Sequence, residues 1–88
     1  MQAEQQNCLE QLTVIVDHLS HIRRMINENQ YCPDILQQTY RLRKKIEKLE
    51  AIILEHHLST CVSIGIRAGD TERVITELVQ MYHLVGNR

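Results

Sequence analysis

Two cysteines and a histidine are spaced so that they could bind a metal ion. Cys32 lies at the start of the segment from Tyr31 to Val62, and His57 and Cys61 lie near its end. If the segment is one helix turning 100° per residue, His57 falls about 20° to one side of Cys32 and Cys61 about 20° to the other. Two thiolates and an imidazole suit a soft ion such as Cu(I), whereas Zn(II) usually takes a fourth ligand. This set therefore favours Cu(I), with Zn(II) or Ni(II) as alternatives.

One chain cannot bring these ligands together on a straight helix. Cys32 and His57 are 25 residues apart, which is about 38 Å at 1.5 Å per residue. If the helix packs antiparallel against its own copy, Cys32 of one chain lies opposite the other chain's His57 and Cys61, with the two-fold axis near Lys45 and Ile46. His57 and Cys61 are four residues apart, so they face one point. The sequence predicts a Cys/His/Cys site between two subunits.

The helix that must carry these ligands has clear signals at both ends. Pro33 suits the first turn, where Asp34 also favours the positive helix end. We expect the helix to end after Val62, because the segment 63–66 has weak helical propensity. Its apolar residues recur in steps of three, four and seven, as one buried helix face requires; they are Ile35, Leu42, Ile46, Leu49 and Ile53.

Two further helices are predicted, one on each side of it. The first covers about residues 5–29, and the short joint after it implies an antiparallel hairpin. Its apolar stripe comprises Cys8, Leu12, Ile15, Leu19, Ile22 and Ile26. The last, shorter helix follows a joint at Gly69, is capped by Asp70 or Thr71 and stops at Gly86. Its apolar face comprises Val74, Ile75, Leu78, Tyr82 and Val85.

Length and composition predict one small all-α domain over residues 1–88. The chain has no Phe or Trp and only three Tyr, so its core must be built from aliphatic side chains, and a second copy would supply missing core. We see no apolar run approaching the length of a membrane span and no signal peptide, which predicts a cytoplasmic protein without a membrane partner. Three cysteines in a reducing compartment favour ligands, reactive thiols or core residues over disulfides.

One basic cluster could contact DNA. The net charge of −1 gives no general attraction to nucleic acid, so a local patch would have to attract phosphates. The candidates are Arg41, Arg43, Lys44, Lys45 and Lys48. The alternative is a solvated helix face paired with Glu47 and Glu50. In the antiparallel dimer the two clusters would meet at the two-fold axis, which makes phosphate contact plausible.

The other cysteine and histidines have simpler interpretations. Cys8 lies on the apolar stripe of the first helix and is interpreted as a core thiol. His56 is about 100° around the helix from His57 and is interpreted as structural. His18 and His21 are three apart but lack a third ligand, so a solvated face is expected. The sequence has no phosphate-binding glycine loop, catalytic triad or carboxylate pair, and we predict that the protein is not an enzyme.

Three segments resemble the CsoR/RcnR family of copper-sensing bacterial repressors: IRRMINENQYCPDILQQ, ILEHHLSTCV and AGDTERVITELV. The similarity runs from about Leu12 to Leu84. It implies a helical dimer with a four-helix-bundle-like core that pairs into a tetramer. It also implies Cu(I) binding between subunits through Cys32, His57 and Cys61, and loss of operator DNA on metal binding.

The resemblance further implies supporting roles for Tyr31, next to the first ligand, and Glu77, which would hydrogen-bond the liganding histidine. One feature departs from the family. Family repressors carry basic residues on the first helix before a Glu-Gly-Gln-like segment, whereas residues 2–21 here contain no Lys or Arg. Val16, Asp17 and His18 stand where that segment would be, although Arg43 matches a family arginine.

Three functions and one purely structural alternative remain open from the sequence. A Cu(I)-responsive repressor explains the ligands and the resemblance. A copper-binding or copper-buffering protein that does not bind DNA would explain the absence of basic residues from the first helix. A thiol or persulfide sensor would use Cys32 and Cys61 but would not need His57. A purely structural assembly module would depend on neither cysteine.

Overall fold

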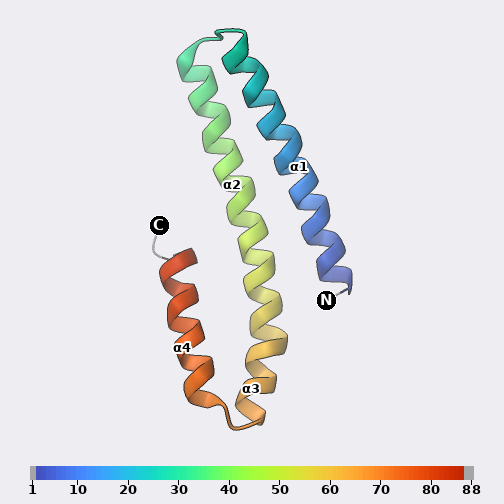
Figure 1. The fold of residues 1–88 in the computed structure, drawn as a ribbon, viewed down its shortest axis with the longest axis vertical. Coiled ribbons are helices and arrows are strands. Elements are labelled where there is room, and N and C mark those ends of the chain that lie inside the picture. Colours follow the sequence, from blue (N-terminus) through green and yellow to red (C-terminus); the bar gives the residue numbers. More distant parts are fainter. Residues whose placement is uncertain (1, 87–88) are drawn as a thin grey trace. The chain divides into compact units, whose positions relative to one another are not determined.

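The computed structural model describes residues 2–86 and is helical throughout, apart from two short turns (Figure 1). Helix α1 (Gln2–Asn27) is followed by α2 (Cys32–His57), which continues without a break through the π-helical segment η1 (Leu58–Val62) into α3 (Ser63–Arg67). Helix α4 (Thr71–Met81) continues into a second π-helical segment, η2 (Tyr82–Gly86). The prediction of an all-α protomer with three helical rods, the last one short, is confirmed.

These helices form two compact units, one up to Leu49 and one from Glu50 onward. The first unit contains α1 and most of α2. The second contains the end of α2 together with η1, α3, α4 and η2. The single domain over residues 1–88 stays a prediction.

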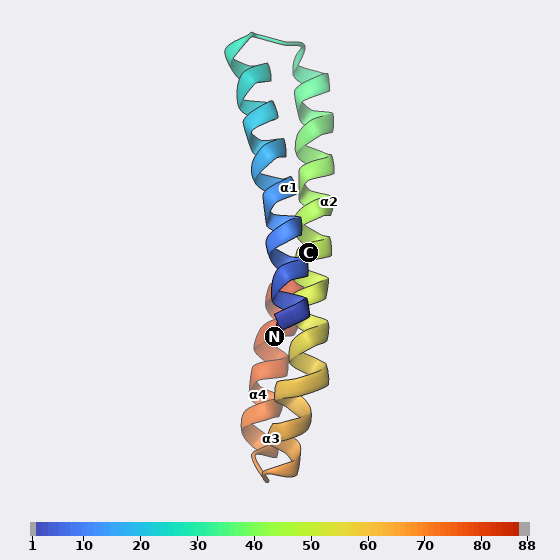
Figure 2. The same cartoon turned by 90° about the vertical axis from the view of Figure 1, so that its right-hand side faces the viewer.

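In the first unit, α1 and α2 form the predicted antiparallel hairpin (Figures 1 and 2). The turn is closed by backbone hydrogen bonds in which Gln30 N donates to Met25 O (3.0 Å) and Asn29 N donates to Ile26 O (3.1 Å). This pattern requires a left-handed residue after the helix end, and Asn29 provides it with φ 51°. Asparagine tolerates that conformation better than most residues.

The core of the first unit uses only part of each predicted apolar stripe. Ile15, Ile22 and Leu42 are buried together, and Ile35 and Leu49 pack against them. Every second residue of the α1 stripe is instead about half exposed: Leu12 45%, Leu19 50% and Ile26 57%. On α2, Ile46 and Ile53 are also exposed. One hairpin therefore covers only one edge of each stripe.

In the second unit, the prediction that the long helix ends after Val62 is wrong. The chain stays helical to Arg67 because packing overrides the weak propensity of residues 63–66. A Cβ added to Gly65 would lie 2.5 Å from Val74 Cγ2, so the missing side chain lets α3 and α4 approach closely. The turn follows at Gly69, whose φ of 89° is left-handed, and Asp70 N donates to Gly65 O (2.9 Å).

The continuous helix Cys32–Arg67 contains an 18-residue window with a mean hydropathy of 1.2, enough by length and composition to cross a membrane. By itself this window does not contradict the expectation of a protein without a membrane span. A single such helix is weak evidence for a span, because core helices of soluble proteins pass the same test.

Candidate metal site and basic surface

Two of the three predicted ligands lie in the second unit. His57 is the last residue of α2, and Cys61 lies within η1. Cys61 is an exposed free thiol, while the His57 side chain is 26% exposed. The thiol sulfur of Cys61 lies 3.6 Å from Thr60 Oγ1. Both groups are of types that bind soft metal ions.

The ring of His57 faces a carboxylate of α4. Its Nε2 lies 3.4 Å from Glu77 Oε2, but this pair lacks the geometry of a hydrogen bond, and Nε2 is a buried atom without a hydrogen-bond partner. The carboxylate is held from the other side, because Arg73 Nη1 donates to Glu77 Oε1 at 2.7 Å. Arg73 Nη2 also lies 3.6 Å from Asp70 Oδ2. Glu77 is therefore positioned to accept a hydrogen bond from a protonated Nε2 after a small adjustment.

Arg73 was not predicted from the sequence, although its spacing from Glu77 contained a signal for it. Arg73 and Glu77 are four residues apart on one helix, a spacing at which opposite charges meet. Asp70 precedes α4 by one residue and pairs with Arg73 at a spacing of three. These pairs connect the start of α4 to the residue that faces His57.

The π-helical segment changes the predicted placement of Cys61. Its backbone hydrogen bonds join residues i and i+5 instead of i and i+4, so each hydrogen-bonded turn holds one residue more than in an α-helix. The step of 100° per residue therefore holds from Cys32 to His57 but fails from Leu58 to Val62. Side chains support the widened turn, since Thr60 Oγ1 (2.7 Å) and Ser59 Oγ (3.1 Å) both donate to the carbonyl of His56.

The third predicted ligand, Cys32, belongs to the first unit. It is the first residue of α2 and an exposed free thiol, and Tyr31 beside it is 72% exposed. Among residues 2–86, no three His, Cys, Asp or Glu side chains gather to hold a metal ion within one chain. The Cys32, His57 and Cys61 set remains a prediction that requires a second subunit.

The structure corrects one histidine assignment. His18 was expected on a solvated face, but it is 8% exposed, because α2 covers it with two polar side chains. Lys45 Nζ lies 2.9 Å from His18 Nδ1, and Gln38 Oε1 lies 2.8 Å from Nε2. His21 is exposed as expected, and Cys8 is half-buried on α1.

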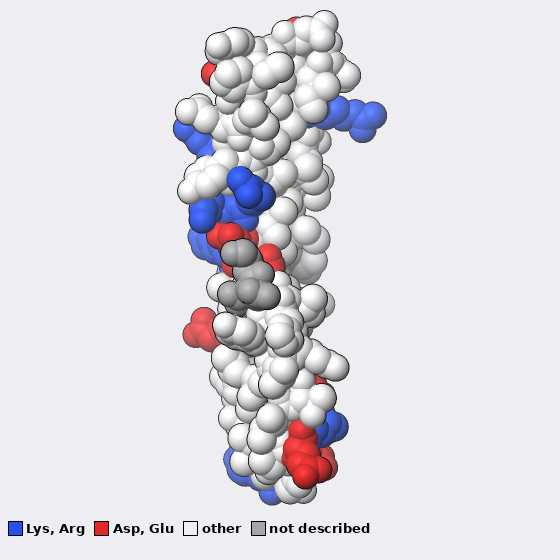
Figure 3. All heavy atoms as spheres, turned by 90° about the vertical axis from the view of Figure 1, so that its left-hand side faces the viewer, with Lys and Arg blue, Asp and Glu red and all other residues white. Residues whose placement is uncertain are grey.

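The basic cluster lies in the middle of α2. Figure 3 shows Lys and Arg side chains close together in this part of the molecule, with acidic atoms beside them. Its members are not equivalent. Lys44 forms an ion pair with Glu47 at 3.3 Å, and Lys45 is held by His18. The charged ends of Arg43 and Lys44 lie 5.6 and 5.4 Å from the centre of the Tyr40 ring.

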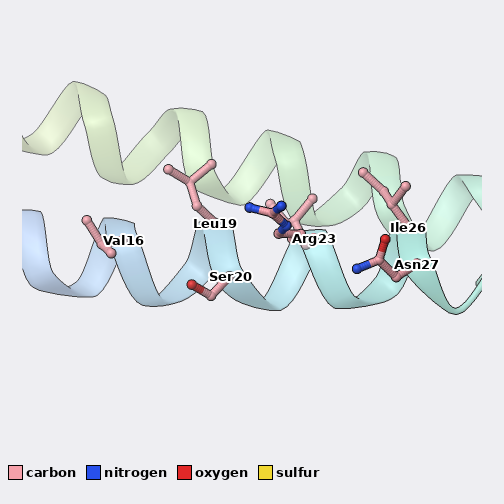
Figure 4. Close-up of a pocket in the computed structure, with 7 residues that line it drawn as sticks. Val16, Leu19, Ser20, Arg23, Ile26 and Asn27 are labelled. Atoms are coloured by element: carbon pink, nitrogen blue, oxygen red, sulfur yellow. The ribbon is translucent and has the colours of Figure 1, made fainter.

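Arg41 and Lys45 line a polar groove of about 410 Å³ between α1 and α2. Its other lining residues are Val14, Asp17, His18, His21 and Gln38. A second groove, of about 490 Å³, is mostly apolar and lies along α1 (Figure 4). It is lined by Val16, Leu19, Ser20, Ile22, Arg23, Ile26 and Asn27.

The comparisons with known proteins identify a family. Copper-sensing transcriptional repressor CsoR of Mycobacterium tuberculosis (strain H37Rv) is 30% identical over 77 residues, which cover 88% of this chain and 65% of the relative. CsoR of Bacillus subtilis (strain 168) is 33% identical over 61 residues, 69% of this chain and 60% of the relative. Copper-sensing transcriptional repressor RicR of Mycobacterium tuberculosis is 29% identical over 66 residues, 75% and 69% of the two chains.

The chain thus spans just under two thirds of the length of the first of these relatives. No solved structure matches it. Residues 4–83 match the model of metal-sensitive transcriptional repressors. That family is regulatory and not catalytic, which confirms the prediction that this protein is not an enzyme. The chain belongs to the metal-sensitive transcriptional repressor family.

Proposed function

We propose that this protein is a cytoplasmic, Cu(I)-responsive transcriptional repressor that releases operator DNA when it binds metal. Cys32 of one chain and His57 and Cys61 of another would hold the ion in a homodimer that pairs into a homotetramer. The family and the copper-sensing relatives support this function. Bound Cu(I) would supply a soft, positively charged centre that joins the two subunits through thiolates and an imidazole.

The approach of His57 to Glu77 is the observation that carries the proposal. Neutral imidazole has one N–H and one lone pair. If Nε2 carries the proton and donates a hydrogen bond to Glu77, Nδ1 keeps the lone pair and becomes the metal ligand, and the carboxylate fixes the orientation of the ring. A buried Nε2 without a hydrogen-bond partner fits this role, because the metal-bound ring would complete that bond. Arg73 then links the ring to the start of α4.

An anaerobic titration with Cu(I) tests the metal site. The reduced protein should bind one ion per chain and develop thiolate-to-copper absorption. Cys32→Ala should lose that stoichiometry, whereas Cys8→Ala, which removes a half-buried thiol outside the set, should keep it. Copper binding that is indifferent to Cys32 would refute the intersubunit site.

A mobility-shift assay with the protein's own promoter tests repression. Binding should weaken with rising salt, because basic side chains replace counterions on phosphates, and Cu(I) should release the DNA. Absence of a shift at low salt would favour the second candidate, a copper-binding protein without an operator. The feature that favours this candidate is the absence of Lys and Arg from residues 2–21.

The exposure of Cys32 and Cys61 keeps a thiol sensor as a third candidate. Persulfide or oxidant would then modify and cross-link the two thiols without a histidine. His57→Ala separates the models: it should abolish the response to copper if the ring is a ligand. An unchanged copper response in this variant would remove the metal-site model.

A further inference from the structure

We propose that His18 is a proton-controlled latch on Lys45, and that protonation of His18 frees Lys45 to contact a DNA phosphate in the polar groove between α1 and α2. The choice of a DNA phosphate as the partner of Lys45 rests on the DNA binding proposed above. The latch itself rests only on contacts within the first unit.

The hydrogen bonds of His18 require a neutral ring. The ammonium of Lys45 can only donate, so at 2.9 Å it must donate to an unprotonated Nδ1 of His18. The proton of the neutral ring is then on Nε2, which donates to Gln38 Oε1 at 2.8 Å. Both partners are on α2, whereas His18 is on α1, so the ring joins the two helices of the hairpin.

A second proton on His18 would break this arrangement. Nδ1–H and the Lys45 ammonium would both be donors, and two positive charges would face each other in a site where His18 is only 8% exposed. The hydrogen bond to Gln38 is compatible with either form, because its oxygen only accepts. Protonation therefore expels Lys45 while Gln38 continues to hold the ring.

The groups around the groove determine where a released Lys45 can go. From α1, Asp17 and His21 line it, and the His18 and His21 ring centres are 6.5 Å apart. From α2, Arg41 and Lys45 line it. After protonation, His18 carries a charge beside two cations and a single carboxylate, so the groove gains positive potential and a mobile ammonium. An oxyanion such as a backbone phosphate would neutralise this excess of positive charge.

The latch predicts that DNA binding depends on pH, because only a neutral His18 ring can accept the hydrogen bond from Lys45. The protein should bind a random-sequence DNA duplex more tightly at pH 6 than at pH 8. One additional phosphate contact should steepen the plot of log affinity against log salt by about 0.9. His18→Gln should abolish this change in slope, because an amide has no proton to gain. His21→Gln is the matched control: it removes a second imidazole from the same groove but should keep the change in slope.

Nitrogen-15 NMR of the imidazole rings in the DNA-free protein tests the latch independently. At pH 8, His18 should show an unprotonated Nδ1 and a protonated Nε2, and Lys45→Met should abolish the single-tautomer signature. At low pH both nitrogens should be protonated. A protonated Nδ1 at pH 8, or a pH-dependent salt slope retained in His18→Gln, would overturn the proposal.

The two proposals fail in distinguishable ways. If NMR shows the latch but the duplex binds at neither pH, the DNA contact fails and the phosphate partner is refuted with it. If the duplex binds with a salt slope that is the same at both pH values, the DNA contact stands and the control by His18 is refuted.

Discussion

The orientation of one imidazole ring decides what the second unit can do with a metal ion. Arg73 holds one oxygen of Glu77 at 2.7 Å, which leaves the other oxygen near His57 Nε2. These groups are partly exposed, and ion pairs of this kind contribute only about 0–1 kcal/mol to stability. The main effect of these ion pairs is therefore to restrict the direction in which the Glu77 carboxylate can point.

Replacing Glu77 tests this geometric role. Glu77→Gln keeps the shape of the side chain but removes the acceptor charge that faces Nε2, so Cu(I) affinity should fall by roughly 10–100-fold while stoichiometry is unchanged. Competition with a Cu(I) chelator measures the affinity. Glu72→Gln, on the same helix but exposed where Glu77 is half-buried, is the control and should have little effect. Equal losses in both variants would show that general charge, and not the contact with His57, matters.

Among the helical elements, the close approach of α3 and α4 depends on Gly65. In Gly65→Ala the new methyl would meet Val74 Cγ2 at 2.5 Å. Overpacking of this kind costs about 1–3 kcal/mol, which exceeds the roughly 0.5–1 kcal/mol that alanine gains over glycine within a helix. Urea denaturation should therefore show a net loss of stability.

A double substitution distinguishes this packing effect from a backbone effect. Val74→Ala removes the contacting methyl, so the Gly65→Ala/Val74→Ala protein should be more stable than the sum of the two single losses predicts. Gly69→Ala is the contrast. No atom lies within 4 Å of its added methyl, so its cost of about 1–2 kcal/mol comes from the left-handed φ and should not depend on Val74. Strict additivity for Gly65 and Val74 would contradict the proposed contact.

The existence of each helix could be predicted from the sequence, but where the helices end and what they contact could be predicted only in part. The spacing of apolar residues identified all three helical rods, and Ile15, Ile22 and Leu42 were correctly placed in the core. The end predicted near Ser63 was wrong because helix propensity is local and the contact of Gly65 with α4 is not. His18 was misplaced for the same reason, since its partners belong to another helix.

The candidate site could be predicted as a set of residue types but not as a geometry. Cysteine and histidine at these spacings are few enough to be recognised. The phase of Cys61 was not predictable, because no periodic pattern marks the π-helical segment that contains it. Arg73 was recognisable only once Glu77 was known to matter.

Considered as a whole molecule, the chain buries little of its apolar surface by itself. No side chain in the described part of the chain is fully buried, and many large apolar residues are half exposed. Folding coupled to association would cover them. The midpoint of thermal unfolding should then rise with protein concentration, as scanning calorimetry over a hundredfold range can measure. A midpoint independent of concentration would indicate a stable monomer.

The apolar groove on α1 is the surface where association is expected. Leu19→Glu places a charge between Val16 and Arg23 in that groove (Figure 4), so it should lower the average mass measured by sedimentation equilibrium. Val14→Glu is the matched control, because it lies on the same helix with similar exposure, 46% against 50%, but faces the polar groove. An equal loss of mass in both variants would place the interface elsewhere.

The widened turn at Leu58–Val62 also limits how the gene encoding this protein can change in length. A π-helical turn accommodates one residue more than an α-helical turn, so deleting Ser59 would leave a chain that can wind as a uniform α-helix. The wide turn and the α-helical turn that replaces it both complete about one revolution, so the residues after the deletion would keep nearly the same phase relative to His57. Loss of a single codon here would therefore leave Glu77 on the side of the imidazole, whereas the same loss within Cys32–His57 would rotate everything after it by about 100°.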